Sequence, residues 1–203
     1  MSDADSTEDR LDSLSPVELA AARGELPEWS RVSTKRRAHM GRVAALMEVW
    51  AHGLGLPEDE ALRWAAAGWL HDALRDEDPE RLVHFVSGEE RQLPGPVLHG
   101  PAAAARLKGT VDPRVVTAIR YHTIGHPRLD RMGRALYLAD FLEPGRDFAE
   151  ERRTGLRARM PAQLDEVLVE VLGSRIKHLI EKRKPIRAET ALFWSSVLEG
   201  GSA

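Results

Sequence analysis

The chain has 203 residues, a length that one domain can fill, and 42% of them are hydrophobic, enough to bury a sizeable core. Its formal net charge is −3, from 29 Lys and Arg against 32 Asp and Glu, and this near balance argues against a nucleic-acid-binding protein. There is no cysteine, which excludes disulfides and thiolate metal sites, so any metal ion would need His and carboxylate ligands.

The N-terminal segment shows no sign of export. Residues 1–15 are polar and acidic, lack the basic and apolar regions of a signal peptide, and are expected to be largely disordered. No apolar run along the chain is long enough to cross a bilayer. We therefore expect a cytoplasmic protein that does not associate with membranes.

Most of the remaining chain shows helical spacing of apolar residues. A short helix is expected to start at Ser15-Pro16-Val17-Glu18, which joins a capping residue, Pro in the first turn and a carboxylate near the helix N-terminus. After a connector, the expected helices lie at 33–54, at 57–72, within the acidic and Gly/Pro-rich stretch 76–96, from His99-Gly100-Pro101 through 102–107, and at 112–122, 129–142, 160–183 and 187–198.

No alternating strand pattern, internal repeat or long linker interrupts this series. The sequence therefore predicts one all-α domain, a single bundle of about eight or nine helices. We expect it to occupy residues 34–199, preceded by an N-terminal extension, 1–33, that is partly disordered and carries one short helix.

One carboxylate stands inside an apolar helical segment. Asp140 follows Leu136-Tyr137-Leu138-Ala139 and precedes Phe141-Leu142. Burying its charge is costly unless a cation compensates it. Either a metal ion or an arginine would serve, and this residue alone does not decide between them.

Three further polar residues complete a candidate ligand set. His71 and Asp72 end the apolar run 64–70, and adjacent helical residues differ in direction by only about 100°, so both can reach one ion. His39 belongs to an earlier helix. Together with Asp140 these residues offer two imidazoles and two carboxylates from three helices, a set that suits iron, manganese, zinc or magnesium.

Two more histidines, His99 and His122, lie at expected helix boundaries close to Gly or Pro. We expect them to bind either a second metal ion or a phosphate oxygen. The sequence leaves these two arrangements equally open.

The order His39, His71-Asp72, Asp140 follows the His…His-Asp…Asp signature of the HD-domain superfamily, and the chain resembles that superfamily. The resemblance extends over roughly residues 35–190. Three longer segments are similar to its YqeK subgroup, namely Leu98-His99-Gly100-Pro101, the run 118–125 containing Tyr121-His122-Thr123, and the run 136–146 containing Ala139-Asp140 and Glu143-Pro144.

The resemblance implies an activity. Proteins of this subgroup are helical, bacterial, cytoplasmic phosphohydrolases that cleave diadenosine tetraphosphate symmetrically to two ADP, with iron as the associated metal. The substrate partner would thus be a nucleotide or dinucleoside polyphosphate. A divalent metal on these ligands would lower the pKa of a water molecule that attacks phosphorus.

The resemblance also assigns roles to residues of this chain. His71 and Asp72 would be catalytic and, with His39 and Asp140, would bind the metal ion. The residues expected to bind substrate are Arg75, Thr123, Gly125 and Arg146, with His99 and His122 binding substrate or a second metal. Arg75 and Arg146 suit polyphosphate because a guanidinium matches phosphate geometry.

The chain departs from the subgroup pattern at three positions in or beside these motifs, and Phe193-Trp194 lies where the subgroup often has Asn in its last helix. Arg75 stands in place of Lys, His126 in place of Arg, and Gly145 in place of Asn. All three fall on expected substrate contacts. Two alternatives therefore stay open: an HD-domain phosphohydrolase acting on another nucleotide or alarmone phosphoester, and a nucleotide-binding sensor without hydrolysis. Trp194 in the last helix is a candidate contact of a homodimer.

Overall fold

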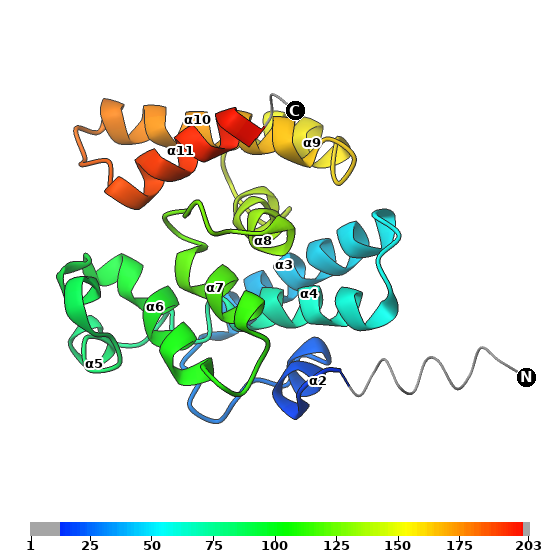
Figure 1. Cartoon of the computed structure of the whole chain (residues 1–203), viewed down its shortest axis with the longest axis vertical. Coiled ribbons are helices and arrows are strands. Elements are labelled where there is room, and N and C mark those ends of the chain that lie inside the picture. The colour runs from blue at the N-terminus through cyan, green and yellow to red at the C-terminus, as the bar shows by residue number, and fades with distance from the viewer. Residues whose placement is uncertain (1–12, 201–203) are drawn as a thin grey trace, which may run out of the picture.

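The computed structural model describes residues 13–200 and is built from helices (Figure 1). This part of the chain contains ten α-helices and one 3-10 helix, and no strand, which confirms the all-α prediction. The helix count slightly exceeds the expected eight or nine. The disorder expected before residue 13 concerns residues outside the described range.

The helices follow one another with short connections. They are α2 (Pro16–Ala22), α3 (Thr34–Gly53), α4 (Glu58–Leu70), α5 (Pro79–Leu82), α6 (Gly95–Leu107), α7 (Pro113–Tyr121), α8 (Arg131–Leu142), α9 (Glu150–Ala158), α10 (Leu164–Glu181) and α11 (Ala188–Gly200), with the 3-10 helix η1 (Gly88–Gln92) between α5 and α6. None of these helices is both long and apolar enough to span a bilayer.

Helix α6 starts earlier than predicted. It begins at Gly95, so His99 lies inside the helix and not at its boundary as expected. Pro101 normally marks a helix start because it lacks an N–H and clashes with the preceding turn. Every residue from 98 to 104 is buried, however, and this packing outweighs the cost of an internal proline.

Helix α9 was not predicted. Its sequence is mostly charged, and only Arg153 and Leu156 are buried. Apolar periodicity cannot detect a helix whose largest buried side chain is an arginine.

The helices that carry the candidate ligands converge at the centre of the molecule. Helices α3 and α4 pack along each other, α7 packs between α6 and α8, and the α10–α11 hairpin covers one end of the bundle beside α8 (Figure 1). The approach of α4 to α3 depends on Gly68, because a Cβ there would lie only 2.5 Å from the Cα of Ala44. This close approach brings His71, at the end of α4, near His39 of α3.

A buried network of charges ties the short helix α2 to the bundle. Ser15 caps α2 as expected, and Ser15 and Glu18 together form a capping box. The Glu18 carboxylate, 1% exposed, also accepts a hydrogen bond from the Asp112 backbone N–H at 3.1 Å and lies 3.5 Å from Nε of Arg63. Arg63 is itself buried and pairs with Glu60 and Asp112. Residues 13–22 are therefore packed into the body of the protein.

We predict that Arg63→Met destabilises the protein by about 3–5 kcal/mol, because it leaves the buried Glu18 carboxylate without its cation. Urea unfolding followed by circular dichroism measures this loss. The control is Lys177→Met, which removes an exposed pair with Glu181 at 3.9 Å and should cost less than about 1 kcal/mol. Equal losses in the two variants would contradict the assigned role of the network.

Candidate metal centre

Four histidines and two aspartates from five parts of the bundle meet at one place. All are buried except Asp140, which is partly exposed. They are His39 on α3, His71 and Asp72 directly after α4, His99 on α6, His122 at the end of α7, and Asp140 on α8. The structure thus brings together every residue expected to bind metal. It also places His99 and His122 there, for which the sequence left open a second metal ion or a phosphate oxygen.

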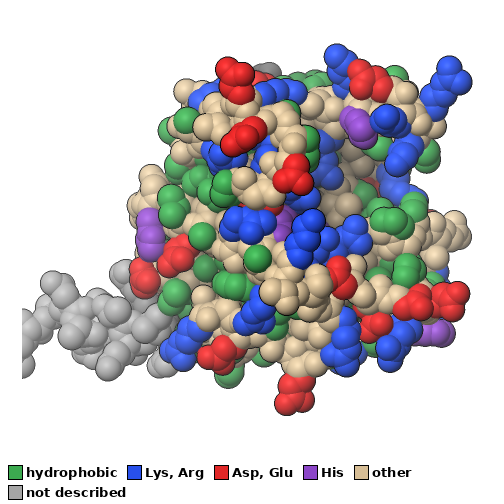
Figure 2. Space-filling model, turned by 180° about the vertical axis from the view of Figure 1, so that it is seen from behind, with side chains coloured by type: hydrophobic (Ala, Val, Ile, Leu, Met, Phe, Trp, Pro, Cys, Tyr) green, Lys and Arg blue, Asp and Glu red, His purple; other side chains and the backbone are tan. Residues whose placement is uncertain are grey.

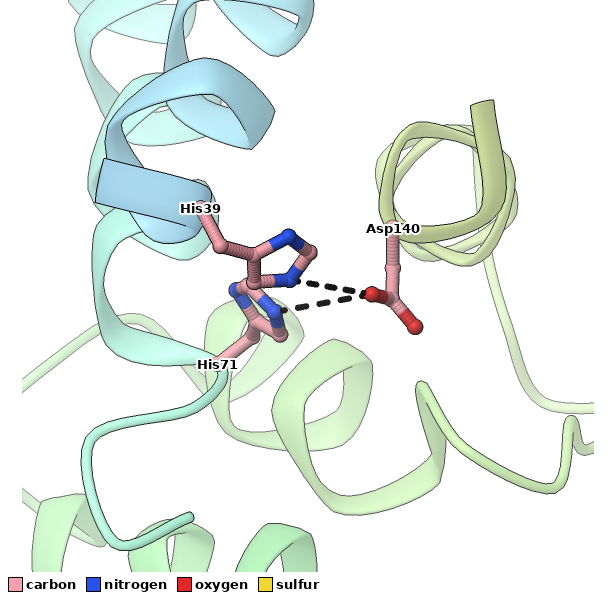
Figure 3. A group of neighbouring side chains, drawn as sticks. All are labelled: His39, His71 and Asp140. Atoms are coloured by element: carbon pink, nitrogen blue, oxygen red, sulfur yellow. Dashed lines mark ion pairs between the residues drawn. The ribbon is translucent and has the colours of Figure 1, made fainter. Parts of the chain in front are cut away.

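The first group of possible ligands consists of His39, His71 and Asp140, whose ligand atoms all lie within 4.8 Å of one another. Oδ1 of Asp140 lies 3.1 Å from Nε2 of His39 and 4.0 Å from Nε2 of His71 (Figure 3). Both imidazoles point toward the same carboxylate oxygen, so one cation could contact all three side chains.

Asp72 lies between this group and the other two histidines. Its Oδ2 is 3.5 Å from Nε2 of His71 and 3.7 Å from Nε2 of His39. Its Oδ1 is 3.0 Å from Nε2 of His99 and 3.6 Å from Nε2 of His122. Each oxygen therefore faces a different pair of imidazoles, which is the position of a carboxylate that can bridge two cations.

The hydrogen bonds of the imidazoles leave ligand atoms free. Nδ1 of His71 lies 2.7 Å from the Gly68 carbonyl, and Nδ1 of His122 lies 2.8 Å from the Ile119 carbonyl. A carbonyl only accepts, so each Nδ1 carries the proton and each Nε2 presents a lone pair to the cluster. Nε2 of His71 is buried without a hydrogen-bond partner among the described residues. Such a nitrogen fits a metal ion.

His39 faces a carboxylate from each ring nitrogen. Nδ1 lies 3.1 Å from Oε1 of Glu143, and Nε2 lies 3.1 Å from Oδ1 of Asp140. Burial by itself lowers the pKa of His39, but the hydrogen bonds to these two carboxylates outweigh it and raise the pKa. The ring therefore holds either two protons or one proton and, at Nε2, a metal ion.

Glu143 was not among the predicted site residues. Burial raises its pKa, but hydrogen bonds from His39, from Nε of Arg42 at 2.5 Å and from the Gly145 N–H at 2.7 Å bring the pKa to about 2. An ionised carboxylate that orients a ligating imidazole is a common partner of metal sites. Its position three residues after Asp140, on the same side of a helix, was the available sequence signal.

The Gly145 departure has a structural explanation. A Cβ at this position would collide with the guanidinium of Arg42, which pairs with Glu143. The absence of a side chain at Gly145 therefore makes room for Arg42 beside the candidate metal centre.

Two arginines contact the aspartates. Nη1 of Arg36, which was not predicted, lies 2.7 Å from Oδ2 of Asp72. Nη2 of Arg146 lies 2.5 Å from Oδ1 of Asp140 and also donates to its main-chain carbonyl at 2.8 Å. Burial raises the pKa of Asp140, but His39, Arg146 and His71 together bring it far below the usual range. The carboxylate is thus paired with both an arginine and the imidazoles.

The other residues predicted to contact substrate differ in how closely they approach the cluster. The main-chain N–H of Arg75 donates to the carbonyl of Asp72 at 2.9 Å, so the main chain of Arg75 lies beside the cluster. Oγ1 of Thr123 lies 3.1 Å from Nε2 of His122. Gly125 is buried with a φ of 75°, and a Cβ there would collide with Phe193. Packing alone accounts for this glycine, and its contact with substrate stays a prediction.

Arg153 of the unpredicted helix α9 holds the segment that follows Asp140. It is 1% exposed and donates to the carbonyls of Phe141 at 3.0 Å, Arg146 at 2.9 Å, Phe148 at 3.3 Å, and Glu143. The last carbonyls of a helix have no partner within it. Arg153 therefore caps α8 from a neighbouring helix and fixes the loop that carries Glu143 and Arg146.

The fold and the site together define a class of protein. A helical bundle whose buried His and Asp side chains converge on one or two cation positions, with arginines beside them, has the parts of a metal-dependent hydrolase. The sequence model described as "HD domain" matches residues 36–154, more than half of the chain. The chain belongs to the HD domain family.

Three relatives are each named "Bis(5'-nucleosyl)-tetraphosphatase, symmetrical". The Halalkalibacterium halodurans protein is 30% identical over 105 residues, which are 50% of this chain and 55% of that protein. The Staphylococcus aureus protein is 28% identical over 173 residues (79% and 82%), and the Bacillus subtilis protein 26% over 144 residues (66% and 75%). The chain thus spans about half of the first relative and at least three quarters of the other two.

A solved structure has the same fold. It is described as a predicted HD superfamily hydrolase involved in NAD metabolism, from Clostridium acetobutylicum, with a TM-score of 0.73, 23% identity, and coverage of 95% of this chain and 97% of that one. HD domains bind divalent metals, and the His/Asp groups here can hold them. At the level of the family, the chain is therefore a metal-dependent phosphohydrolase.

We predict that Glu143→Gln weakens Mn²⁺ binding about 10–100-fold, the usual cost of losing a carboxylate that orients a ligand histidine. Titration calorimetry with Mn²⁺ measures the change. Glu166→Gln, which alters an exposed carboxylate on α10, should leave the affinity unchanged. Equal Mn²⁺ affinity in the two variants would rule out a role for Glu143 at the metal.

We predict that Arg153→Met lowers the free energy of unfolding by at least about 3 kcal/mol, since several buried carbonyls lose their donor at about 1 kcal/mol or more each. Its neighbour Arg152 bonds the Ser174 hydroxyl at an exposed position, so Arg152→Met is the matched control and should cost under about 1 kcal/mol. Chemical denaturation of both variants decides the point, and indistinguishable stabilities would contradict it.

Proposed function

We propose that this protein hydrolyses diadenosine tetraphosphate symmetrically to two molecules of ADP. The observation that carries the proposal is the position of Asp72, with one carboxylate oxygen toward His39 and His71 and the other toward His99 and His122. Such a site suits the in-line attack of water on a phosphoanhydride between two cations. The names of the three relatives supply the substrate.

In this proposal the ligands of the first ion are His39, His71, Asp72 and Asp140. Of the two arrangements left open by the sequence, the distances from Oδ1 of Asp72 to Nε2 of His99 and of His122 favour a second ion. His71, Asp72 and His122 also form a group that could hold a metal ion. A bound divalent ion supplies positive charge that lowers the pKa of a water molecule and neutralises phosphate oxygens. Iron is our choice because the resemblance to the YqeK subgroup implies it. Imidazole and carboxylate ligands also admit manganese, zinc and magnesium, which are to be tested beside it.

The arginines of the site bind the polyphosphate. Arg36 and Arg146 pair with Asp72 and Asp140, so their guanidinium groups lie where they could also donate to phosphate oxygens. Arg75 adds a third positive group near His99. Seen from behind, the molecule is hollowed between its two halves, and Lys and Arg side chains gather beside the hollow (Figure 2).

Hydrolysis consumes one water molecule and breaks one P–O bond at the oxygen that bridges the second and third phosphorus atoms. ADP leaves as a stabilised phosphate anion and needs little acid assistance. The chain's contribution is to hold the phosphates beside the metal ligands with its arginines, so the position of the nucleoside determines which anhydride bond is cut.

A second substrate class is supported by one residue. His126, where the subgroup has Arg, stacks on Tyr121 with ring centroids 4.1 Å apart and accepts a hydrogen bond from the Arg128 N–H. One expected guanidinium contact to phosphate is therefore absent. Another nucleotide or alarmone phosphoester is accordingly the alternative substrate, and a panel of such compounds separates the two.

We predict that metal-loaded protein converts diadenosine tetraphosphate to ADP as the sole nucleotide product, separated by chromatography. His71→Ala and Asp72→Ala should each lower the rate more than about a hundredfold. This is a larger loss than that caused by changing a residue that only hydrogen-bonds a metal ligand. His178→Ala, which alters an exposed histidine, should retain full activity. EDTA should abolish turnover, and the added metal should restore it.

Other outcomes have defined meanings. Formation of ATP and AMP would show that the protein is a hydrolase but would rule out symmetric cleavage. No turnover of this substrate, with cleavage of another phosphoester that needs His71, would move the assignment to that substrate. Nucleotide binding without hydrolysis of any member of the panel would favour a sensor.

A further inference from the structure

Away from the candidate metal ligands, the described part of the chain has a cavity with a volume of about 740 Å³. It lies between η1, the adjoining parts of α6 and α7, and the start of α11. Its volume falls in the range of small-molecule sites. None of the candidate metal ligands lines it, so the metal centre does not account for this cavity.

The cavity is next to the metal centre along the chain. Tyr121, which lines it, directly precedes His122, and Pro101, which also lines it, is two residues after His99. Consecutive Cα atoms are 3.8 Å apart, so the cavity wall begins within about 4–8 Å of the main chain of these histidines. The cavity and the metal centre are therefore built on the same stretches of α6 and α7.

An aromatic platform stands in the cavity wall. The Tyr121 and His126 rings are stacked, with centroids 4.1 Å apart and planes 23° apart. Because His126 supports Tyr121 from one side, the tyrosine ring is held in place before any ligand arrives. A fixed aromatic ring favours the binding of nucleobases. Any base can stack on such a ring, because stacking does not depend on the hydrogen-bonding groups of the base.

The charges of the wall do not suit a phosphate chain. Three carboxylates, Glu89, Glu90 and Glu189, outnumber the two guanidinium groups, and Arg120 is already paired with Glu90. Carboxylates bind ribose hydroxyls and base amino groups by accepting their hydrogen bonds. The wall therefore fits the nucleoside part of a nucleotide, whereas the arginines of the metal centre fit its phosphates.

One guanidinium in the wall is free. Among the residues that the structure describes, the Arg187 side chain has no hydrogen-bond or ion-pair partner, although it is only partly exposed. It stands at the start of α11, across the cavity from η1. An unpaired arginine in a wall of carboxylates can donate to the base or to the first phosphate of a bound nucleotide.

We propose that this cavity is the subsite for one nucleoside of a dinucleoside polyphosphate, with Tyr121 as the stacking surface and Arg187 as a donor. The inference rests on the proposed function and adds a specificity device to it. A nucleoside fixed here sets how far along the phosphate chain the metal centre acts. The cavity thereby selects the bond that is cut.

The test measures binding and turnover separately. Titration calorimetry with ADP gives a dissociation constant that does not depend on hydrolysis, and steady-state kinetics with diadenosine tetraphosphate gives KM and kcat. Tyr121→Leu and Arg187→Ala should each weaken ADP binding about tenfold, within the range for losing one base–aromatic contact, and raise KM much more than they lower kcat.

Two matched variants complete the design. Tyr121→Phe keeps the ring and should retain wild-type ADP affinity. Lys182→Ala removes an exposed positive charge after α10 and should change neither quantity. If Tyr121→Leu loses its helical circular dichroism signal, Arg187→Ala, at a partly exposed position, decides the question.

The outcomes separate this inference from the proposed function. Wild-type ADP affinity and KM in both Tyr121→Leu and Arg187→Ala would overturn the nucleoside subsite while leaving hydrolysis intact. Absence of ADP binding to the wild-type protein would also overturn it. Weakened ADP binding in the variants, in a protein that does not cleave diadenosine tetraphosphate, would uphold the subsite and refute the proposed substrate.

Discussion

Two aspartates, Asp72 and Asp140, lie among four imidazoles in the interior of the bundle, and their charge has to be compensated there. Water cannot do this for Asp72, which is 3% exposed. Arginines supply part of the compensation, and the buried Nε2 of His71, which has no hydrogen-bond partner among the described residues, suits a cation that would supply more. Much of the surrounding structure can be understood as the means of holding these charges in place.

The packing of the helices serves this arrangement at two levels. Gly68 lets α4 approach α3 closely, and its carbonyl also fixes the ring of His71, so one short segment sets both the position and the orientation of a candidate ligand. On the other side, Arg153 binds the carbonyls that follow α8 and holds Glu143 against His39. A buried arginine on a polar helix is thus linked to the metal centre through the main chain.

Positive and negative side chains are concentrated at different places, and this division suits a long ligand whose parts differ in charge. The arginines beside Asp72 and Asp140 provide the positive charge that a phosphate chain needs. The neighbouring cavity carries an aromatic platform and more carboxylates than guanidinium groups. The names of the relatives are consistent with a nucleotide substrate, and in our proposal the two surfaces divide its phosphate and nucleoside parts between them.

The sequence by itself determined the all-α fold, most helices and the types and order of the candidate ligands, because apolar periodicity and charged residues in apolar runs are local signals. It did not reveal helix α9, the early start of α6, or the roles of Glu143, Arg36 and Arg153. These depend on contacts between distant segments: Glu143 and His39 are 104 positions apart in the chain. Only tertiary packing decides which buried polar groups meet, since a residue's own neighbours do not specify its distant partner.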